Sequence, residues 1–248
     1  MENAVTYCLG ILLPTGLILA SDSRSNAGVD QVQKVCKLAL ITAPGSRVIA
    51  VLSAGNLATT QSVVTQLQQS AGSGVAGSDV HLARTMFDVA TIVGEKLREV
   101  VEHDGKYVAP YGDPTASFLV GGQISGEAPR LFEIYSAGNF IEASSRSCFL
   151  QIGETKYGKP ILDRALDFSS PLEHAAKLAL LSFDATMRSN LSVGMPIDIL
   201  RYETDSFSAV NIATLEDHND YWRSLRNGYA DGLTTLVDRL PAPPQVFG

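Results

Sequence analysis

The 248-residue sequence has few cysteines and histidines, and these shortages exclude two kinds of site. Its three cysteines, Cys8, Cys36 and Cys148, are an odd number without a CxxC pair, so a disulfide framework is not expected. The four histidines are scattered without metal-ligand spacing, and no zinc or other metal is predicted. We expect the three thiols to be small buried side chains in a reducing compartment.

Positive charge and long apolar runs are also scarce. Nineteen Lys and Arg oppose 26 Asp and Glu, a formal net charge of −7, which argues against a nucleic-acid surface or an anionic membrane as partner. Pro14 and Gly16 interrupt the apolar residues 8–20, and Glu2 stands where a signal peptide would carry a basic residue. No secretory signal or membrane span is predicted, and a cytoplasmic location is expected.

What the sequence does contain is a set of short apolar strands at its start. Residues 5–13 and 16–21 predict a β-hairpin around a Pro-Thr-Gly turn, and residues 35–43 and 47–53 predict a second pair. These runs are almost continuously apolar, which is typical of strands covered on both faces.

Helices and further strands follow in blocks. Helical periodicity predicts five helices, at 57–69, 81–102, 156–166, 171–188 and 218–239. Strands are predicted at 115–122, 130–135, 140–143, 148–152, 197–204 and 207–213. We expect Ser78 or Asp79 to cap the second helix and Ser169 or Ser170 to cap the fourth. The last helix carries a Tyr/Leu stripe, expected to be core or subunit contact.

This order of elements predicts an α+β fold, a four-layer αββα sandwich with two sheets inside and helices on both outer faces. No internal repeat or long linker divides the chain. Residues 6–240 are therefore expected to form a single domain, with an N-terminal extension at 1–5 and a C-terminal tail at 241–248.

Three residues in the first strands suggest a chemistry. Thr6 opens the first strand, Asp22 ends its partner strand, and Lys37 lies on the third. A threonine beside an acid and a lysine would be a nucleophile with its own charge partners, which indicates a hydrolase. Lys34 is the alternative lysine, but on an alternating strand it would face away from Lys37, which fits the strand context better.

Five stretches in this order carry a resemblance to a known family. They are TYCLG at 6–10, ASDSRSNAGVD at 20–30, SAGNLATTQ at 53–61, IGETKYGKP at 152–160 and MRSNLSVG at 187–194. Over nearly its whole length the chain resembles the proteasome β-subunit superfamily of N-terminal nucleophile hydrolases. Within that superfamily it looks most like the bacterial Anbu group, the ancestral β subunit.

The resemblance implies a threonine-type endopeptidase. Thr6 Oγ would be the nucleophile and its own α-amine, with a pKa of roughly 8, the general base. Lys37 would lower the pKa of the hydroxyl by its positive charge, and Asp22 would pair with Lys37. A backbone N–H at Gly55 or Asn56, at a helix start, would form the oxyanion hole.

Other matched positions are less regular. Ser192 resembles the serine that hydrogen-bonds the threonine amine in relatives. Ser189 stands where proteasome subunits usually carry Asp, so it lacks that charge. Glu154 lies near a position where relatives use a serine and is a further candidate. Arg24 would either position substrate or pair with an acid, and we expect the pairing.

Residues 1–5 precede Thr6, and an amine held in a peptide bond cannot act as a base. Relatives either cut a propeptide after Gly or begin Met-Thr and lose only Met, whereas here Val5 precedes Thr6. We hypothesise that codon 5 is GTG and is the true start. Removal of the initiator methionine would then expose Thr6, and native protein beginning at Glu2 or Asn3 would contradict this.

Two classes of function follow from the resemblance. One is a peptidase acting on peptides or unfolded protein inside a self-assembled oligomer, with no cofactor. The other is a noncatalytic scaffold subunit, and a non-protease amidase is the least favoured reading. Self-association is expected to give a closed ring or an open helix, depending on whether the rotation between subunits closes. Dependence on an unidentified ATPase is left open.

Overall fold

The computed structural model describes residues 6–26, 32–207 and 212–244. Its strands are β1 (Tyr7–Leu13), β2 (Gly16–Asp22), β3 (Arg24–Asn26), β4 (Val32–Lys34), β5 (Leu38–Ala43), β6 (Arg47–Gly55), β7 (Ala116–Ile124), β8 (Arg130–Ile134), β9 (Phe140–Glu142), β10 (Phe149–Gly153), β11 (Ile197–Glu203) and β12 (Ile212–Leu215). Its helices are α1 (Leu57–Ser70), α2 (Met86–Val108), α3 (Lys159–Ala165), α4 (Leu172–Ser189) and α5 (Asp220–Arg239).

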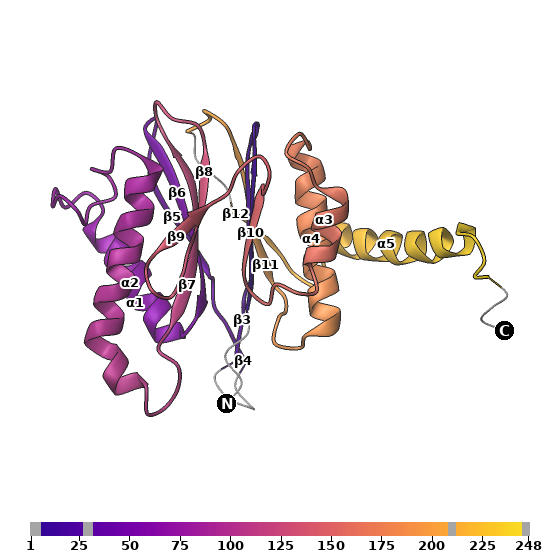
Figure 1. Cartoon of the computed structure of the whole chain (residues 1–248), viewed down its shortest axis with the longest axis horizontal. Coiled ribbons are helices and arrows are strands. Elements are labelled where there is room, and N and C mark those ends of the chain that lie inside the picture. The colour runs from indigo at the N-terminus through magenta and orange to yellow at the C-terminus, as the bar shows by residue number, and fades with distance from the viewer. Residues whose placement is uncertain (1–5, 27–31, 208–211, 245–248) are drawn as a thin grey trace.

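Two antiparallel sheets form the centre of the molecule (Figure 1). One has the strand order β10-β1-β2-β11-β12 and the other β5-β6-β7-β8-β9. Helices α1 and α2 cover the outer face of the second sheet, and α3 and α4 cover the outer face of the first (Figure 1). The predicted α+β class, with two sheets, is confirmed.

Apolar side chains fill the space between the sheets, which explains the nearly continuous apolar strands. Cys8, Leu19 and Leu131 belong to one buried cluster that both sheets share, while two other clusters lie beneath the helices on the two outer faces. The first predicted hairpin is confirmed: β1 and β2 pair from Cys8↔Ser21 to Leu13↔Gly16. Gly16 has φ +146°, and a Cβ there would lie 1.9 Å from the Tyr202 carbonyl oxygen, so this turn requires glycine.

The second helix begins later than predicted. Helix α2 starts at Met86 rather than near residue 81, and its cap is Thr85, which forms a capping box with Asp88. The prediction of Ser78 or Asp79 as the cap was wrong. The Asp79 carboxylate instead closes the preceding loop by accepting hydrogen bonds from the N–H groups of Gly72, Gly74 and His81.

The boundaries of α3 and α4 also differ from the prediction. Helix α3 is shorter, running only from Lys159 to Ala165 after Gly158. Helix α4 follows Pro171, which makes no side-chain cap, so the prediction of a serine cap was wrong. The Ser170 hydroxyl accepts from the Asp167 N–H instead and closes the loop before the helix.

Two strand predictions need correction. Strand β5 begins at Leu38 rather than residue 35, because the Val35 N–H leaves this sheet and donates to the Ser23 carbonyl oxygen at 2.8 Å. The short hairpin of β3 and β4 was not predicted, since its three-residue strands carry no apolar pattern. Strand β12 begins at Ile212, and the rest of the predicted strand 207–213 falls largely on residues 208–211, outside the described residues.

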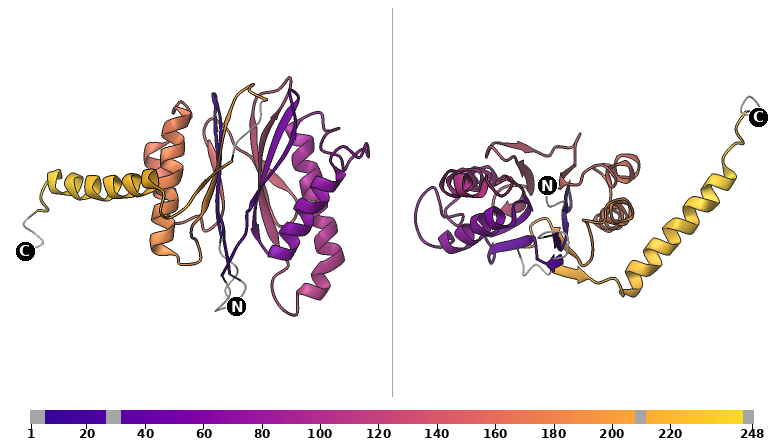
Figure 2. Two further views of the ribbon diagram at one scale, coloured as in Figure 1. Left: turned by 180° about the vertical axis from the view of Figure 1, so that it is seen from behind. Right: turned by 90° about the horizontal axis from the view of Figure 1, so that it is seen from below.

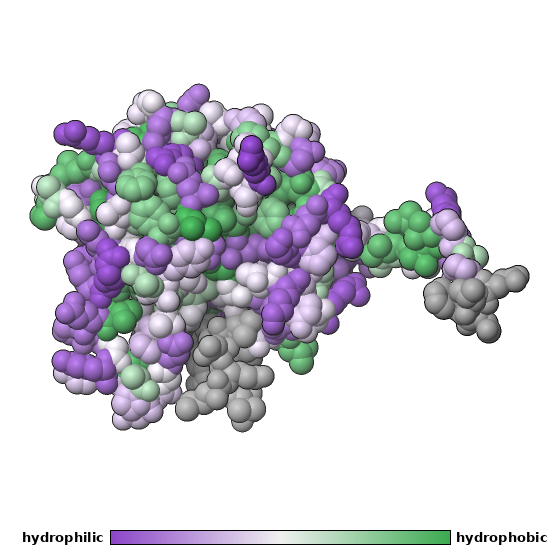
Figure 3. Space-filling view, in the orientation of Figure 1, coloured by the Kyte–Doolittle hydropathy of each residue, from purple (hydrophilic) through white to green (hydrophobic). Residues whose placement is uncertain are grey.

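Helix α5 extends away from the body of the molecule (Figure 2). Only Trp222 is buried among its side chains, and the Arg226 guanidinium donates to buried Asp184 on α4 at 2.7 Å. Leu233, Leu236 and other apolar side chains farther along remain exposed, and Figure 3 shows hydrophobic residues on the projecting part of the molecule. The outer part of the Tyr/Leu stripe is therefore not core, whereas Leu225 packs against the cluster beneath α3 and α4. Within the described ranges, no helix combines the length and apolar character needed to cross a membrane.

Candidate active site

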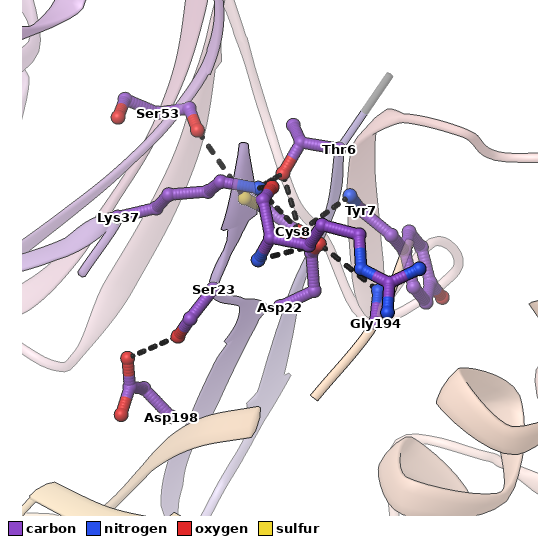
Figure 4. A network of polar contacts seen from close by, with 10 residues as sticks. Thr6, Tyr7, Cys8, Asp22, Ser23, Lys37, Ser53, Gly194 and Asp198 are labelled. Carbon is purple, nitrogen blue, oxygen red and sulfur yellow. Dashed lines mark hydrogen bonds and ion pairs between the residues drawn. The ribbon is translucent and has the colours of Figure 1, made fainter. Parts of the chain in front are cut away.

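Thr6, Asp22 and Lys37 meet at one end of the two sheets (Figure 4). Thr6 directly precedes β1, and Asp22 ends the neighbouring strand β2. The Thr6 hydroxyl donates to Asp22 Oδ1 and accepts from Lys37 Nζ, and Lys37 Nζ lies 2.7 Å from Asp22 Oδ1. Thr6, Asp22 and Lys37 are 4%, 0% and 9% exposed. The charges of Asp22 and Lys37 therefore act on the Thr6 hydroxyl with little screening by water.

Backbone and side-chain donors surround the buried Asp22 carboxylate. Besides Thr6 and Lys37, it accepts from the N–H groups of Tyr7 at 3.1 Å, Arg24 at 3.2 Å and Gly194 at 3.3 Å. A carboxylate without exposure to water requires such partners. Asp22 therefore ties the end of β2 to β1 and to the loop before β11.

Lys37 reaches the site from a loop, not from the predicted third strand. It stands one residue before β5, yet its carbonyl oxygen still accepts from the Ser53 N–H on β6 at 3.2 Å. Its ammonium also donates to the Arg24 carbonyl oxygen at 2.5 Å. Lys34, the alternative, is exposed and lies 3.4 Å from Glu216, so geometry assigns the lysine of this site to Lys37.

The two predicted oxyanion donors differ in availability. The Asn56 N–H already donates to the Thr115 carbonyl oxygen at 3.0 Å, while its side chain caps α1. Along a strand, alternate N–H groups point to the same edge, so the Gly55 N–H points to the edge that Ser53 uses. Next to this edge Val35 has left the sheet, because its N–H donates to the Ser23 carbonyl oxygen. The Gly55 N–H is therefore the better placed of the two.

Glu154 contacts the backbone of Thr6, and Ser192 is linked to Glu154 through Asn190. The Glu154 N–H donates to the Thr6 carbonyl oxygen at 2.7 Å, and Glu154 Oε2 accepts from Asn190 Nδ2 at 2.9 Å. Asn190 Oδ1 in turn accepts from the Ser192 N–H at 2.9 Å. In the part of the chain that the structure describes, the Ser192 hydroxyl makes no hydrogen bond to Thr6, and Ser189 is exposed at the end of α4.

Arg24 holds the same loop by a route that was not predicted. Its Nη1 donates to the Leu191 carbonyl oxygen at 2.6 Å, and its guanidinium lies so close to Gly194 that a Cβ there would meet it at 2.7 Å. Among the described residues Arg24 forms no salt bridge with an acid, so the expected pairing stays a prediction.

Sequence reasoning also missed Gly194 and the Ser23–Asp198 contact. The Gly194 N–H donates to Asp22. The place of Gly194 at the end of the fifth family-like stretch could have pointed to this contact. Asp198 on β11 accepts from the Ser23 hydroxyl at 2.9 Å and the Thr214 hydroxyl at 2.7 Å (Figure 4). No local pattern announces this contact, because 175 residues separate Ser23 from Asp198.

Cys8 lies beside the site but is not a competing nucleophile. Its Sγ donates to the Ser53 carbonyl oxygen at 3.5 Å, and burial raises the pKa of the thiol to about 12, so it stays protonated near neutral pH. Cys148 is buried as predicted, whereas Cys36 is exposed, contrary to the prediction. The described cysteines are all free thiols.

A pocket of about 270 Å³ opens at Thr6; we call it the Thr6 pocket. Its wall is mostly apolar or neutral, with Val35, Ala39, Leu57 and Val64 among the lining residues. Lys37 and Gly55 also line it, so the hydroxyl, the ammonium and the candidate oxyanion donor border one space. Across residues 6–26, 32–207 and 212–244, no cluster of His, Cys, Asp and Glu has the arrangement of a metal site.

Comparisons with solved structures identify relatives over nearly the whole chain. Anbu (ancestral beta-subunit) from Yersinia bercovieri is 44% identical, with a TM-score of 0.90, covering 96% of this chain and 98% of that one. The helical assembly of the Anbu complex from Pseudomonas aeruginosa is 45% identical, with a TM-score of 0.92 and coverages of 98% and 100%. Anbu from Hyphomicrobium sp. strain MC1 is 43% identical, with a TM-score of 0.86 and coverages of 96% and 99%.

No family model and no curated protein matches the sequence. The solved relatives nevertheless agree in fold and share more than two fifths of their residues with this chain, over almost the full length of both partners. The family-like stretches that contain Thr6, Asp22 and Gly194 also converge on one site, where Lys37 joins them. The chain therefore belongs to the Anbu (ancestral β-subunit) family, as its sequence predicted.

Proposed function

We propose that the protein is a proteasome-like threonine endopeptidase that hydrolyses peptide bonds when Thr6 is amino-terminal. One observation carries this proposal: the Thr6 hydroxyl contacts both Lys37 and Asp22 in a buried site that opens onto a pocket. The Lys37 ammonium beside the oxygen favours the charged form of the hydroxyl that a nucleophile needs, and Asp22 pairs with Lys37. Membership of the Anbu family supports the same reading.

In the acylation step, Thr6 Oγ attacks the carbonyl carbon of the scissile peptide bond. The free Thr6 amine takes the hydroxyl proton, and Lys37 stabilises the developing negative charge on Oγ. The Gly55 N–H donates to the carbonyl oxygen as it becomes an oxyanion. The C–N bond then breaks, the amine returns the proton to the leaving nitrogen, and the acyl group stays on Thr6 as an ester.

In the deacylation step, water takes the place of the departed amine. The Thr6 amine removes a proton from this water, whose oxygen attacks the ester carbon. The C–Oγ bond breaks, Oγ regains the proton, and the second product leaves as a carboxylic acid. Asp22 holds Lys37 toward Oγ throughout. Glu154 and Ser192 are positioning candidates, because they reach the Thr6 backbone directly or through Asn190.

Trapping the ester intermediate tests this function. A chain beginning at Thr6 is incubated with a peptide β-lactone, whose ring opens on a nucleophilic hydroxyl and leaves an ester. We expect the intact mass to rise by one inhibitor mass and peptide mapping to place the adduct on Thr6. Thr6→Ala is the control and should remain unlabelled. An adduct on another residue, or none with any peptide sequence, would contradict the proposal.

A scaffold function is the second candidate, and one observation favours it. In this sequence the nitrogen of Thr6 is part of a peptide bond to Val5, and such an amide is not a base. The intact mass and first residue of protein made from the native gene separate the two candidates. A first residue of Thr6 supports the peptidase, whereas retention of residues 1–5 supports a scaffold or an unactivated precursor.

We infer further that the two sheets and their helices are the αββα sandwich of the N-terminal nucleophile hydrolases. Two outer helix layers beside two inner sheets support this reading. Residues 6–240 would form its single domain, and 241–248 its tail. The proposed substrates are peptides or unfolded protein, and dependence on an ATPase is not part of the proposal.

We also propose that this chain self-associates into a ring or an open helix and that α5 contributes to the contact. The relative from Pseudomonas aeruginosa, described as a helical assembly, matches essentially the whole chain, α5 included. Exposed apolar side chains on α5 support its role, with Leu233 43%, Leu236 54% and Val237 62% exposed. Exposed apolar surface of this kind is typical of protein contacts.

Charged residues on α5 should therefore break the assembly. We expect the double variant Leu233→Asp/Leu236→Asp to sediment as a smaller species than the unaltered chain, because each carboxylate would have to be buried without a partner. Analytical ultracentrifugation measures the effect. Leu82→Asp, at an exposed leucine in the loop before α2, is the control. Unchanged sedimentation of the double variant would exclude this face of α5 from the contact.

A further inference from the structure

Two further hollows continue from the Thr6 pocket. The middle hollow, of about 370 Å³, shares Ala54 and Gly55 with the Thr6 pocket. The far hollow, of about 730 Å³, shares Glu133, Gln151 and Thr155 with the middle hollow. Neighbouring hollows adjoin one another at these shared lining residues, and we call the three together the groove. It runs from Thr6 past the ends of β6 and β10 toward α3.

The chemistry gives this groove a direction. In the proposed reaction the acyl part of the substrate stays bonded to Thr6 Oγ, so it occupies the Thr6 pocket, which Thr6 itself lines. The leaving segment must depart on another side. The middle hollow lies across Gly55, the candidate oxyanion donor, and Thr6 does not line it. The groove beyond Gly55 is thus placed to hold the residues that follow the cleaved bond.

Glu133 is an unexpected residue in this groove. Along β8, Phe132 and Ile134 pack in the cluster under the helices, whereas Leu131 packs in the cluster between the sheets. By alternation, Glu133 points to the same side as Leu131, toward the other sheet. A carboxylate on the core side of a strand is rare without a partner. Its position indicates a role other than packing.

Glu133 also lacks a partner of its own. Within the described residues it forms no salt bridge and no side-chain hydrogen bond, although it is partly buried. Burial raises the pKa of its carboxyl group. It lines both the middle and the far hollow. A cation that entered the groove would offset the cost of this uncompensated carboxylate.

We propose that the groove binds the leaving segment of a peptide substrate and that Glu133 selects a lysine or arginine side chain within it. This proposal rests on the proposed peptidase function for its direction. The selection by Glu133 is a preference in peptide binding, which can be measured without peptide hydrolysis. A charge-assisted hydrogen bond to a half-buried carboxylate accounts for the preference.

The test measures binding of labelled peptides to the full chain by fluorescence anisotropy. Three peptides of otherwise identical sequence carry Lys, Gln or Glu at one position, and the position is scanned along the peptide. At one or two positions we expect the Lys peptide to bind roughly tenfold more tightly than the Gln peptide, and the Glu peptide to bind least. Raising the salt concentration should reduce the difference.

The variant Glu133→Gln keeps the shape of the side chain and should remove the preference for Lys. Glu102→Gln is the matched control, since Glu102 is exposed on α2 and lines none of the three hollows. Thermal unfolding checks the fold, and Glu133→Gln should be at least as stable as the unaltered chain because it removes an uncompensated carboxylate. Equal affinities for Lys and Gln peptides at every position, or a preference that survives in Glu133→Gln, would overturn the proposal.

The outcomes separate this proposal from the peptidase function. If the Lys preference depends on Glu133 but no form of the chain cleaves a peptide, the groove stands as a binding site and the proposed hydrolysis fails. If a chain beginning at Thr6 cleaves peptides without any Lys preference in binding, the hydrolysis stands and the role of Glu133 fails.

Discussion

A chain that begins at Thr6 is expected to hydrolyse a peptide amide at least about a hundredfold faster than the chain that retains residues 1–5. A well-placed general base contributes roughly 10²- to 10⁴-fold to such a reaction, and in this site the free Thr6 amine is the proposed base. In the longer chain this nitrogen is an amide. The Thr6 hydroxyl would keep its contacts with Lys37 and Asp22 in both forms.

The comparison uses three purified chains that begin at Thr6, at Val5 and at Met1, each confirmed by intact mass. A fluorogenic peptide amide reports the initial rate. The chain beginning at Val5 is the closest control, because it differs by one residue and has a free amine at the wrong position. Thr6→Ser in the shortest chain should retain measurable activity, whereas Thr6→Ala should have none. Equal rates for the chains beginning at Thr6 and Val5 would exclude the Thr6 amine as the base.

The second large effect is expected for Lys37→Met, which keeps a long side chain but removes the ammonium. We expect the rate of peptide hydrolysis to fall by about 10²- to 10³-fold, since one positive charge no longer stabilises the developing alkoxide. The free energy of unfolding should also fall, by about 3–5 kcal/mol. Asp22 has no exposed surface, so loss of its salt bridge leaves a buried carboxylate without its cation.

A double variant distinguishes the catalytic from the structural part of this effect. Adding Asp22→Asn to Lys37→Met removes the uncompensated charge and should restore much of the lost unfolding free energy, measured in urea. The rate should not recover, because the ammonium is still absent. A Lys37→Met variant with normal stability and normal rate would mean that the Lys37–Asp22 contact has neither role.

Local chemistry made the first hairpin and the meeting of Thr6 with Asp22 at its ends predictable. A Pro-Thr-Gly turn between two apolar runs fixes the register of β1 and β2 over a few residues, and that register brings Thr6 beside Asp22. The start of α1 was similarly readable, since Asn56 is a good cap. Interactions of this range depend only on neighbouring residues.

Competition between partners decided the places where the sequence prediction failed. Asp79 is a good helix cap in isolation, but it closes a loop with three N–H groups instead. Residues 35–43 have strand character throughout, yet Val35 bonds to Ser23 and β5 starts at Leu38. Each such segment has more than one acceptable partner, and local propensity does not rank them.

The sequence by itself determined the family, the two-sheet α+β class and the identity of Thr6, Asp22 and Lys37 as one group. Only the tertiary structure decided that Lys37 arrives from a loop, that Gly55 rather than Asn56 keeps an available N–H, and that Glu133 lines a groove. The physical reason is the distance along the sequence between the residues that interact. The turn of the first hairpin is encoded by adjacent residues, whereas the direction of an N–H or a carboxylate depends on which distant strand lies opposite it.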